Sequence, residues 1–144
     1  MAHEDCLRCG ERTGFYAGLI GRLNEDGEPT EGSLLAYAAH ELSLGMRQAD
    51  GATLRTHLLS LWRQSGSMPE QLWPVDCPDA VQYLWEYFCN MNARRTHGEH
   101  GPNPITDEGV EAWARRRGIV LQPFENEALD ALEQFYLSST AKSK

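Results

Sequence analysis

The sequence predicts an all-α fold: a small bundle of four to five short helices preceded by a polar N-terminal arm. Apolar residues recur three and four positions apart in successive segments, whereas no segment alternates apolar and polar residues as a long strand would. Loops rich in Gly and Pro separate these segments. The chain has 144 residues, 41% of them hydrophobic, which suits one domain with a packed core. We expect an arm and weak helix over residues 1–25 and a helical domain over residues 30–140.

The first two helical segments differ in strength. Residues 13–23 space their apolar side chains as a helix does, but each of their three glycines weakens that helix by ~1 kcal/mol relative to alanine. Residues 24–32 contain Gly and Pro and form a loop. Residues 33–49 predict a helix with a continuous apolar stripe. That stripe consists of Leu35, Ala38, Ala39, Leu42 and Met46.

The next helix has recognisable start and stop residues. Asp50 or Thr53 can cap its N-terminus, and it runs to about Gln64 before Gly66 ends it. Residues 67–78 contain three prolines and should be extended or form a single turn. This connector therefore separates the first half of the bundle from the second.

The second half begins with the strongest helix, over residues 79–92, because it carries a broad apolar face. Residues 96–104 cannot form regular structure, and Thr106 then caps a short helix that Gly118 ends.

The chain ends in one more predicted helix. Residues 119–121 form a brief strand-like link, Pro123 opens the last helix, and residues 138–144 form a polar tail that frays. The core expected from all these segments consists of Leu42, Leu58, Leu61, Leu84, Trp85, Phe88, Trp113, Leu129 and Leu132.

Charge restricts the class of partner. The formal net charge is −8, so a nucleic-acid backbone would be repelled. Two basic clusters, Arg94–Arg95 and Arg115–Arg117, fall where helices should end and offset the helix dipole there. The alternative is that they form a basic patch facing a partner. We find no apolar run long enough to span a membrane and no signal peptide, and we expect a protein of the host cell cytoplasm.

One pair of cysteines has the spacing of metal ligands. Cys6 and Cys9 form a Cys-x-x-Cys motif, whose thiolates can hold zinc if two further ligands complete a tetrahedral site. His97 and His100 lie three residues apart and can in principle supply those ligands, and His3 is a further candidate. A redox role and exposed structural thiols are the alternatives. We expect the last of these, with no metal or other cofactor required.

The sequence carries no recognisable catalytic or cofactor-binding motif, and we expect no enzymatic activity. Cys77 and Cys89 lie among apolar residues and are interpreted as small buried hydrophobes. Trp62 precedes the proline-rich connector and Trp73 lies within it, and these two are the best candidates for exposed anchors that bind a partner. Arg94 and Arg95 join them as candidate partner-binding residues.

The second half also resembles a known family. The succession of motifs from Leu72 to Leu137 is similar to small tail assembly chaperones of long-tailed bacteriophages. The motifs are Tyr83-Leu84-Trp85-Glu86-Tyr87-Phe88, Asn92-Ala93-Arg94, Gly101-Pro102-Asn103-Pro104-Ile105-Thr106, Val110-Glu111-Ala112-Trp113-Ala114, Gly118, Leu121-Gln122-Pro123-Phe124-Glu125, Leu129-Asp130-Ala131-Leu132-Glu133 and Phe135-Tyr136-Leu137. The order and spacing of the whole set carry the resemblance, and the Cys-x-x-Cys arm lies outside it.

The resemblance implies a non-enzymatic helical protein that acts during tail morphogenesis. Such a chaperone coats the tape measure protein, keeps its apolar surface soluble and helps to bring tail tube subunits to it. The implied partner is therefore the tape measure protein or the tail tube protein. A second hypothesis is a small phage protein of another role, either a structural tail component or an inhibitor that binds a host protein, and stabilisation by zinc is compatible with either. The oligomeric state is not predicted by any of these patterns.

Overall fold

The computed structural model describes residues 16–142 and confirms the all-α prediction. Residues 16–20 form a short helical turn. The longer helices are α2 (Leu34–Leu44), α3 (Leu54–Ser65), α4 (Gln82–Asn92), α5 (Asp107–Arg116) and α6 (Pro123–Lys142). Two single-turn 3-10 helices are η1 (Glu70–Leu72) and η2 (Asp79–Val81), and a small hairpin joins β1 (His97–Gly98) to β2 (Gly101–Pro102).

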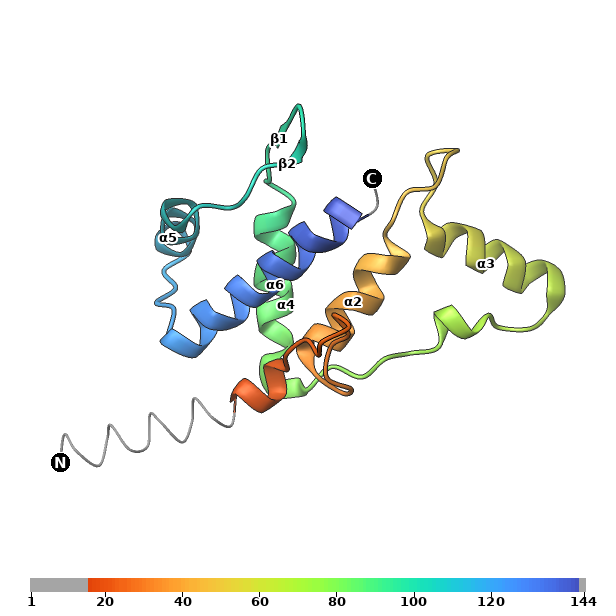
Figure 1. Ribbon diagram of the computed structural model, residues 1–144, viewed down its shortest axis with the longest axis horizontal. Helices are drawn as coiled ribbons and strands as arrows, with labels where there is room; N and C mark the ends of the chain where they lie inside the picture. Colours follow the sequence, from red (N-terminus) through yellow and green to blue (C-terminus); the bar gives the residue numbers. More distant parts are fainter. Residues whose placement is uncertain (1–15, 143–144) are drawn as a thin grey trace.

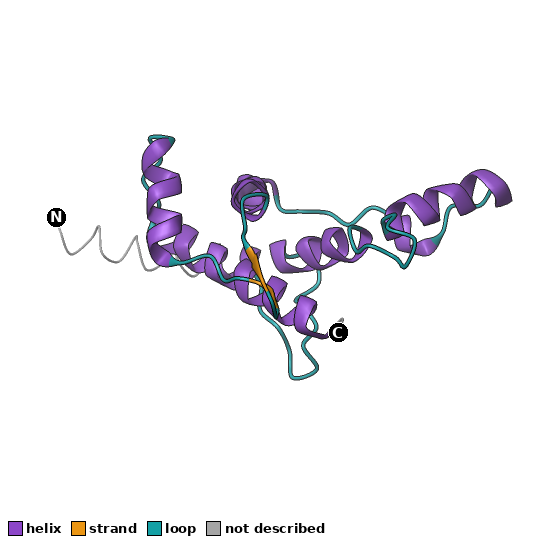
Figure 2. Cartoon of the chain, turned by 90° about the horizontal axis from the view of Figure 1, so that it is seen from above, coloured by secondary structure: helices purple, strands orange, loops and turns teal. Residues whose placement is uncertain are grey.

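The core lies where α2, α4 and α6 cross (Figure 1). Its fully enclosed side chains include Leu34 on α2, Leu84 on α4 and Leu132 on α6. The short α5 contributes Trp113, whose indole Nε1 donates a hydrogen bond of 2.9 Å to Asn90 Oδ1 on α4. Figures 1 and 2 show α5 and α3 at opposite ends of the molecule, with the core helices between them.

The helix predicted over residues 33–49 ends early, at Leu44. Ser33 caps its N-terminus, since its hydroxyl accepts a hydrogen bond from the amide of Ala36. After Gly45 the chain turns back instead of continuing the helix, because the Leu54 amide bonds to the Met46 carbonyl at 2.8 Å. Met46, placed by the sequence on the apolar stripe, is consequently 47% exposed. The expected last turn of this helix is wrong.

Two segments are more regular than the sequence predicts. Within residues 96–104, β1 and β2 pair in antiparallel fashion, and Gly101, the first residue of β2, has a φ of +117°. The polar tail after Ser138 does not fray at once, since α6 continues to Lys142. In the opposite sense, residues 119–121 form no strand.

Most of the predicted core is buried. Six of the nine expected residues lie in the interior: Leu58, Leu84, Phe88, Trp113, Leu129 and Leu132. Leu42 and Trp85 are half-buried. Leu61 is 53% exposed, so its assignment to the core is wrong. The reason is the position of α3, which lies to one side of the helices that form the core (Figures 1 and 2).

Candidate functional site

Capping residues fix both ends of helix α3, whereas little of the helix is buried. The Thr53 hydroxyl accepts a hydrogen bond from the Thr56 amide and so caps the N-terminus. At the other end, Gly66 adopts a φ of +77° and its amide bonds to the Trp62 carbonyl at 2.8 Å. Leu58 is the one side chain of α3 that is buried. An amphipathic helix with so little of its apolar face covered leaves that face available to a partner.

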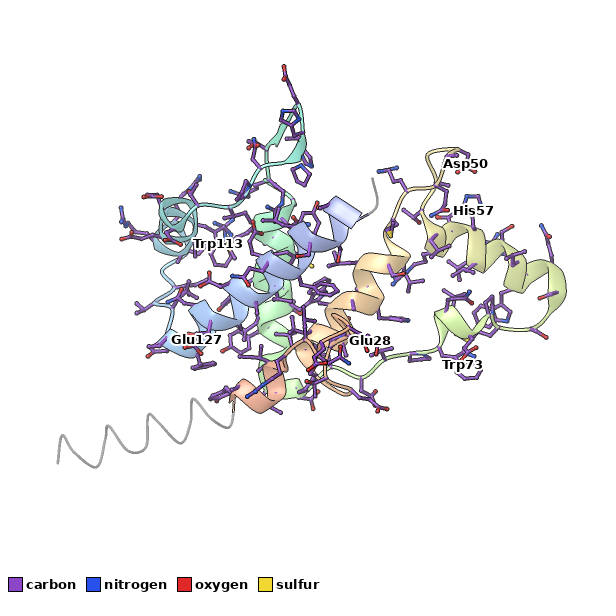
Figure 3. The ribbon with its side chains drawn as sticks, in the orientation of Figure 1. Glu28, Asp50, His57, Trp73, Trp113 and Glu127 are labelled. Atoms are coloured by element: carbon purple, nitrogen blue, oxygen red, sulfur yellow. The ribbon has the colours of Figure 1, made fainter. Side chains whose placement is uncertain are left out.

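Exposed apolar side chains gather on α3 and the connector that follows it. Leu61 and Trp62 are 53% and 39% exposed, and Met68 and Trp73, beyond Gly66, are 37% and 56% exposed. These four belong to a set of only seven large hydrophobic side chains that are exposed within residues 16–142. Figure 3 shows Trp73 beside η1, at the end of the molecule that α3 occupies. We call these four residues the α3–η1 apolar surface.

A groove of about 400 Å³ runs between α2, α3 and the connector. The Trp62 and Met68 side chains of the α3–η1 apolar surface line it, together with Tyr37 of α2. Its remaining lining residues are His40, Glu41, Leu44, Arg55, Leu59, Leu72, Pro74 and Val75. Most of the residues that line the groove are therefore apolar, and the exposed Trp62 is one of them.

Polar contacts at the surface hold the two walls of this groove together. The Arg55 guanidinium on α3 lies 2.8 Å from the Glu41 carboxylate on α2. Nε2 of His40 lies 3.0 Å from the Gln71 carbonyl in η1. Exposed ion pairs of this kind contribute about 0–1 kcal/mol. The α3–η1 segment is thus attached to the core more weakly than the core helices are to one another.

A carboxylate–imidazole pair lies at the start of α3. Asp50 Oδ1 and His57 Nε2 are 3.0 Å apart, and both side chains are exposed (Figure 3). The hydrogen bond from His57, together with one from the Ala52 amide, lowers the pKa of the Asp50 carboxyl. The pair joins the turn to the first part of α3, which is a structural role.

The structure separates the two arginines that the sequence groups together. Arg95 is internal: its side chain is 1% exposed, and two of its guanidinium nitrogens bond to the Glu133 carboxylate on α6. It also donates to the Asn103 carbonyl at 2.8 Å and lies over the Tyr136 ring at 4.4 Å. Arg94, in contrast, is exposed. Of the two, Arg94 is the one that a partner can reach in this structure.

The cysteines give no sign of a reactive thiol or a metal site in the part of the chain that the structure describes. Cys6 and Cys9 lie outside the described residues, so the zinc hypothesis stays untested. No cluster of three His, Cys, Asp or Glu side chains suited to a metal occurs within residues 16–142. Cys77 is half-buried, but Cys89 is exposed, which corrects the expectation that both are buried. Loss of solvation and the charges of Glu41 and Glu86 raise the pKa of Cys89 to about 11, so its thiol is protonated at neutral pH.

Comparison with known protein families matches residues 61–138 to the family described as Phage tail assembly chaperone. The matched segment covers more than half of the chain. The chain belongs to the phage tail assembly chaperone family. The family is non-enzymatic, as the sequence predicts. No curated protein and no solved structure matches the chain.

Membership of the tail assembly chaperone family confirms the resemblance seen from Leu72 to Leu137 and extends it to Leu61. The match begins within α3, so Trp62, Trp73, Arg94 and Arg95 all lie inside it. No helix among the described residues is long and apolar enough to cross a membrane.

The sequence predicts the exposure of two of the four residues of the α3–η1 apolar surface, Trp62 and Trp73. It placed Leu61 in the core and did not single out Met68. The sequence nevertheless contained a signal for the exposure of Leu61 and Met68. Gly66 and a proline-rich connector follow α3, so no helix comes directly after it to pack on its second half.

Proposed function

We propose that this tail assembly chaperone binds a helical segment of the phage tape measure protein or tail tube protein through its α3–η1 apolar surface. Binding takes place during tail morphogenesis in the host cell cytoplasm. The observation that supports this proposal is the concentration of exposed apolar side chains on one segment of the fold. That segment includes the start of the matched region.

The chemistry of the surface suits an amphipathic helix. A partner helix presents apolar side chains at i, i+3, i+4 and i+7, which can lie along a groove with aromatic walls. Trp62 lines such a groove, and Trp73 extends the apolar area beyond it. Tryptophan is enriched among the residues that dominate binding energy, because one side chain removes a large apolar area from water.

The net charge of −8 has a different role in this proposal. Exposed charges keep a protein soluble and mainly affect the rate of encounter with a partner. Apolar contacts should then carry the affinity of the complex, and moderate salt should weaken the complex little.

The test is co-expression with the tape measure protein, and separately with the tail tube protein, of the same phage. Trp62→Ala and Trp73→Ala should each reduce the amount of partner that co-purifies and remains soluble. The matched control is Val120→Ser, which also removes an exposed apolar side chain (81% exposed) but lies near α5, away from the α3–η1 apolar surface. Thermal melting of each purified variant checks that the core is unchanged.

Three results would contradict the proposal. The first is a partner that is equally soluble alone and never co-purifies with the wild-type chain. In that case the alternatives are a structural tail component or an inhibitor of a host protein. The second is an equal loss of binding in Val120→Ser, and the third is full binding by the double variant Trp62→Ala/Trp73→Ala.

A further inference from the structure

A second groove, of about 360 Å³, lies at the end of the molecule opposite α3. It is formed by the end of α4, the loop after β2 and one side of α5. Apolar lining comes from Met91, Ile105 and Trp113. Four arginines also line this groove, whereas no aspartate or glutamate does. We call it the arginine groove.

The arginines of this groove differ in whether their charge is already compensated. Arg95 is paired with Glu133, as described above. Arg117 lies over the Trp113 ring at 4.8 Å and donates a 3.0 Å hydrogen bond to Asn90 Oδ1, but these partners are neutral. Arg94 and Arg116 are exposed and make no ion pair or hydrogen bond with any side chain of residues 16–142. Three cationic side chains thus converge without an acidic partner.

The pKa of Arg117 reflects the same excess of positive charge. Partial loss of solvation and then the charges of Arg94 and Arg116 lower the pKa of its guanidinium. Such an accumulation is unusual in a chain of net charge −8. Like charges held together repel one another in the free protein, and an anion placed between them relieves that repulsion.

The helix dipole accounts for only part of this arrangement. Cations in the last turn of a helix offset its carbonyl end, and both Arg115 and Arg116 occupy the last turn of α5. Arg115, however, is directed to Glu111 at 3.0 Å, so its charge is compensated on its own helix. Arg94 follows the end of α4 and faces the same groove as Arg116. The dipole explains neither that convergence nor the apolar lining between the two arginines.

We propose that the arginine groove binds an acidic segment of a protein partner. Its carboxylates would accept hydrogen bonds from Arg94 and Arg116, and an adjacent apolar side chain would contact Met91, Ile105 and Trp113. Guanidinium groups suit this task because their planar donors match a carboxylate. A nucleic acid fits less well, because its long phosphate backbone would extend past this small groove over a protein whose net charge is −8. The groove is separate from the α3–η1 apolar surface, so either site can fail its test without the other.

The experiment measures binding of a fluorescently labelled amphipathic peptide that carries glutamates at i, i+3, i+4 and i+7 with leucines between them. The full chain should bind it and should bind the matched glutamine peptide at least about tenfold more weakly, as expected for the loss of hydrogen bonds between charged groups. The double variant Arg94→Gln/Arg116→Gln should show a similar loss for the glutamate peptide. Neither side chain makes an ion pair or side-chain hydrogen bond within residues 16–142, and their charges repel that of Arg117, so this variant should melt no lower than the wild type.

The matched control is Arg22→Gln/Arg63→Gln, which removes the same net charge from exposed residues outside the groove, one of them on α3 at the opposite end of the molecule (Figure 1). It should change the affinity by less than about twofold, because salt screens exposed charges that lie far from the bound peptide. An equal loss in both double variants would overturn the proposal, since net charge alone would then explain binding. Equal affinity for the glutamine peptide, no binding of either peptide, or stronger binding of single-stranded DNA of similar length would also overturn it.

Discussion

Replacement of Glu133 by Gln tests the most connected buried contact of the fold. The Glu133 carboxylate on α6 accepts hydrogen bonds from two nitrogens of Arg95 and, at 2.8 Å, from the amide of Ile105. Arg95 precedes the β1–β2 hairpin and Ile105 follows it, so one carboxylate fixes both ends of this segment. Gln has nearly the same shape as Glu but removes the negative charge.

The expected loss of stability follows from the burial of the cation. The Arg95 side chain is 1% exposed and that of Glu133 is 16% exposed, so water screens neither group well. Removing one partner of a buried ion pair costs about 3–5 kcal/mol, because the remaining charge is left uncompensated. Arg95 keeps its bonds to Asn92 and the Asn103 carbonyl and its contact with Tyr136. We therefore expect about 3 kcal/mol, at the lower end of that range.

The assay is urea unfolding of the full chain, supported by thermal melting. Glu133→Gln should shift the denaturation midpoint without changing the slope, and it should lower Tm by about 10 °C for a domain of this size. The control is Glu127→Gln on the exposed side of the same helix (Figure 3), which should change stability by less than about 0.5 kcal/mol. Amide exchange should also become faster in the hairpin, since its anchor is weakened.

A double-mutant cycle with Arg95→Met separates the ion pair from other effects. If the two side chains stabilise each other as the geometry indicates, the double variant should be less destabilised than the sum of the single variants by about 2 kcal/mol. Strict additivity, or a loss below about 1 kcal/mol in Glu133→Gln, would refute this account of the Arg95 environment.

Other sites give equally specific expectations. Gly21→Ala should lower the free energy of unfolding by at least about 2 kcal/mol, because Gly21 has a φ of +86° and a Cβ there would lie 2.4 Å from the Ser33 hydroxyl that caps α2. In the same unfolding assay, the control Gly18→Ala should be neutral or stabilising, since a Cβ at this helical position meets no other atom within 4 Å. Leu132→Ala should cost about 2–5 kcal/mol by urea unfolding, since the side chain is fully enclosed, and a cost below about 1 kcal/mol would contradict its burial. Alkylation of Cys89 by iodoacetamide, followed by mass spectrometry of its peptide, should titrate with a pKa of about 11. At pH 8 it should be about tenfold slower than that of an ordinary thiol, because the roughly 100-fold loss of thiolate is partly offset by greater nucleophilicity, and an ordinary rate would refute the shift.

The positions of helices were predictable where a local signal fixes them. Thr53 and Thr106 cap the N-termini of α3 and α5, and Gly66 ends α3, as the sequence predicts. The enclosed residues of α4 and α6 follow a helical period. The end of α2 was not predictable from periodicity, because Met46 continues the apolar stripe in sequence. A backbone bond between the Met46 carbonyl and the Leu54 amide ends the helix, and such a pairing across a turn leaves no periodic signal.

The candidate site shows the same division between local and long-range causes. Trp62 and Trp73 were predicted to be exposed, and both are, while their role as partner-binding anchors stays a prediction. The burial of Arg95 was not recognisable, because its partner Glu133 is 38 residues away in the chain. The convergence of Arg94 and Arg116 has the same origin, since the packing of α4 beside α5 brings them together.

The apolar residues of this chain fall into two groups that hydrophobicity alone does not distinguish. Leu34 and Ala38 on α2 lie outside the family match, yet they cover Leu84 and Leu132 within it, so the chain itself completes this core. Leu61, at the beginning of the match, also lies on an apolar helix face, but within residues 16–142 it is left 53% exposed. Because burial of the first group is already satisfied, substitution there should act on stability. The second group can still gain free energy by leaving water, and a partner is what would provide that burial.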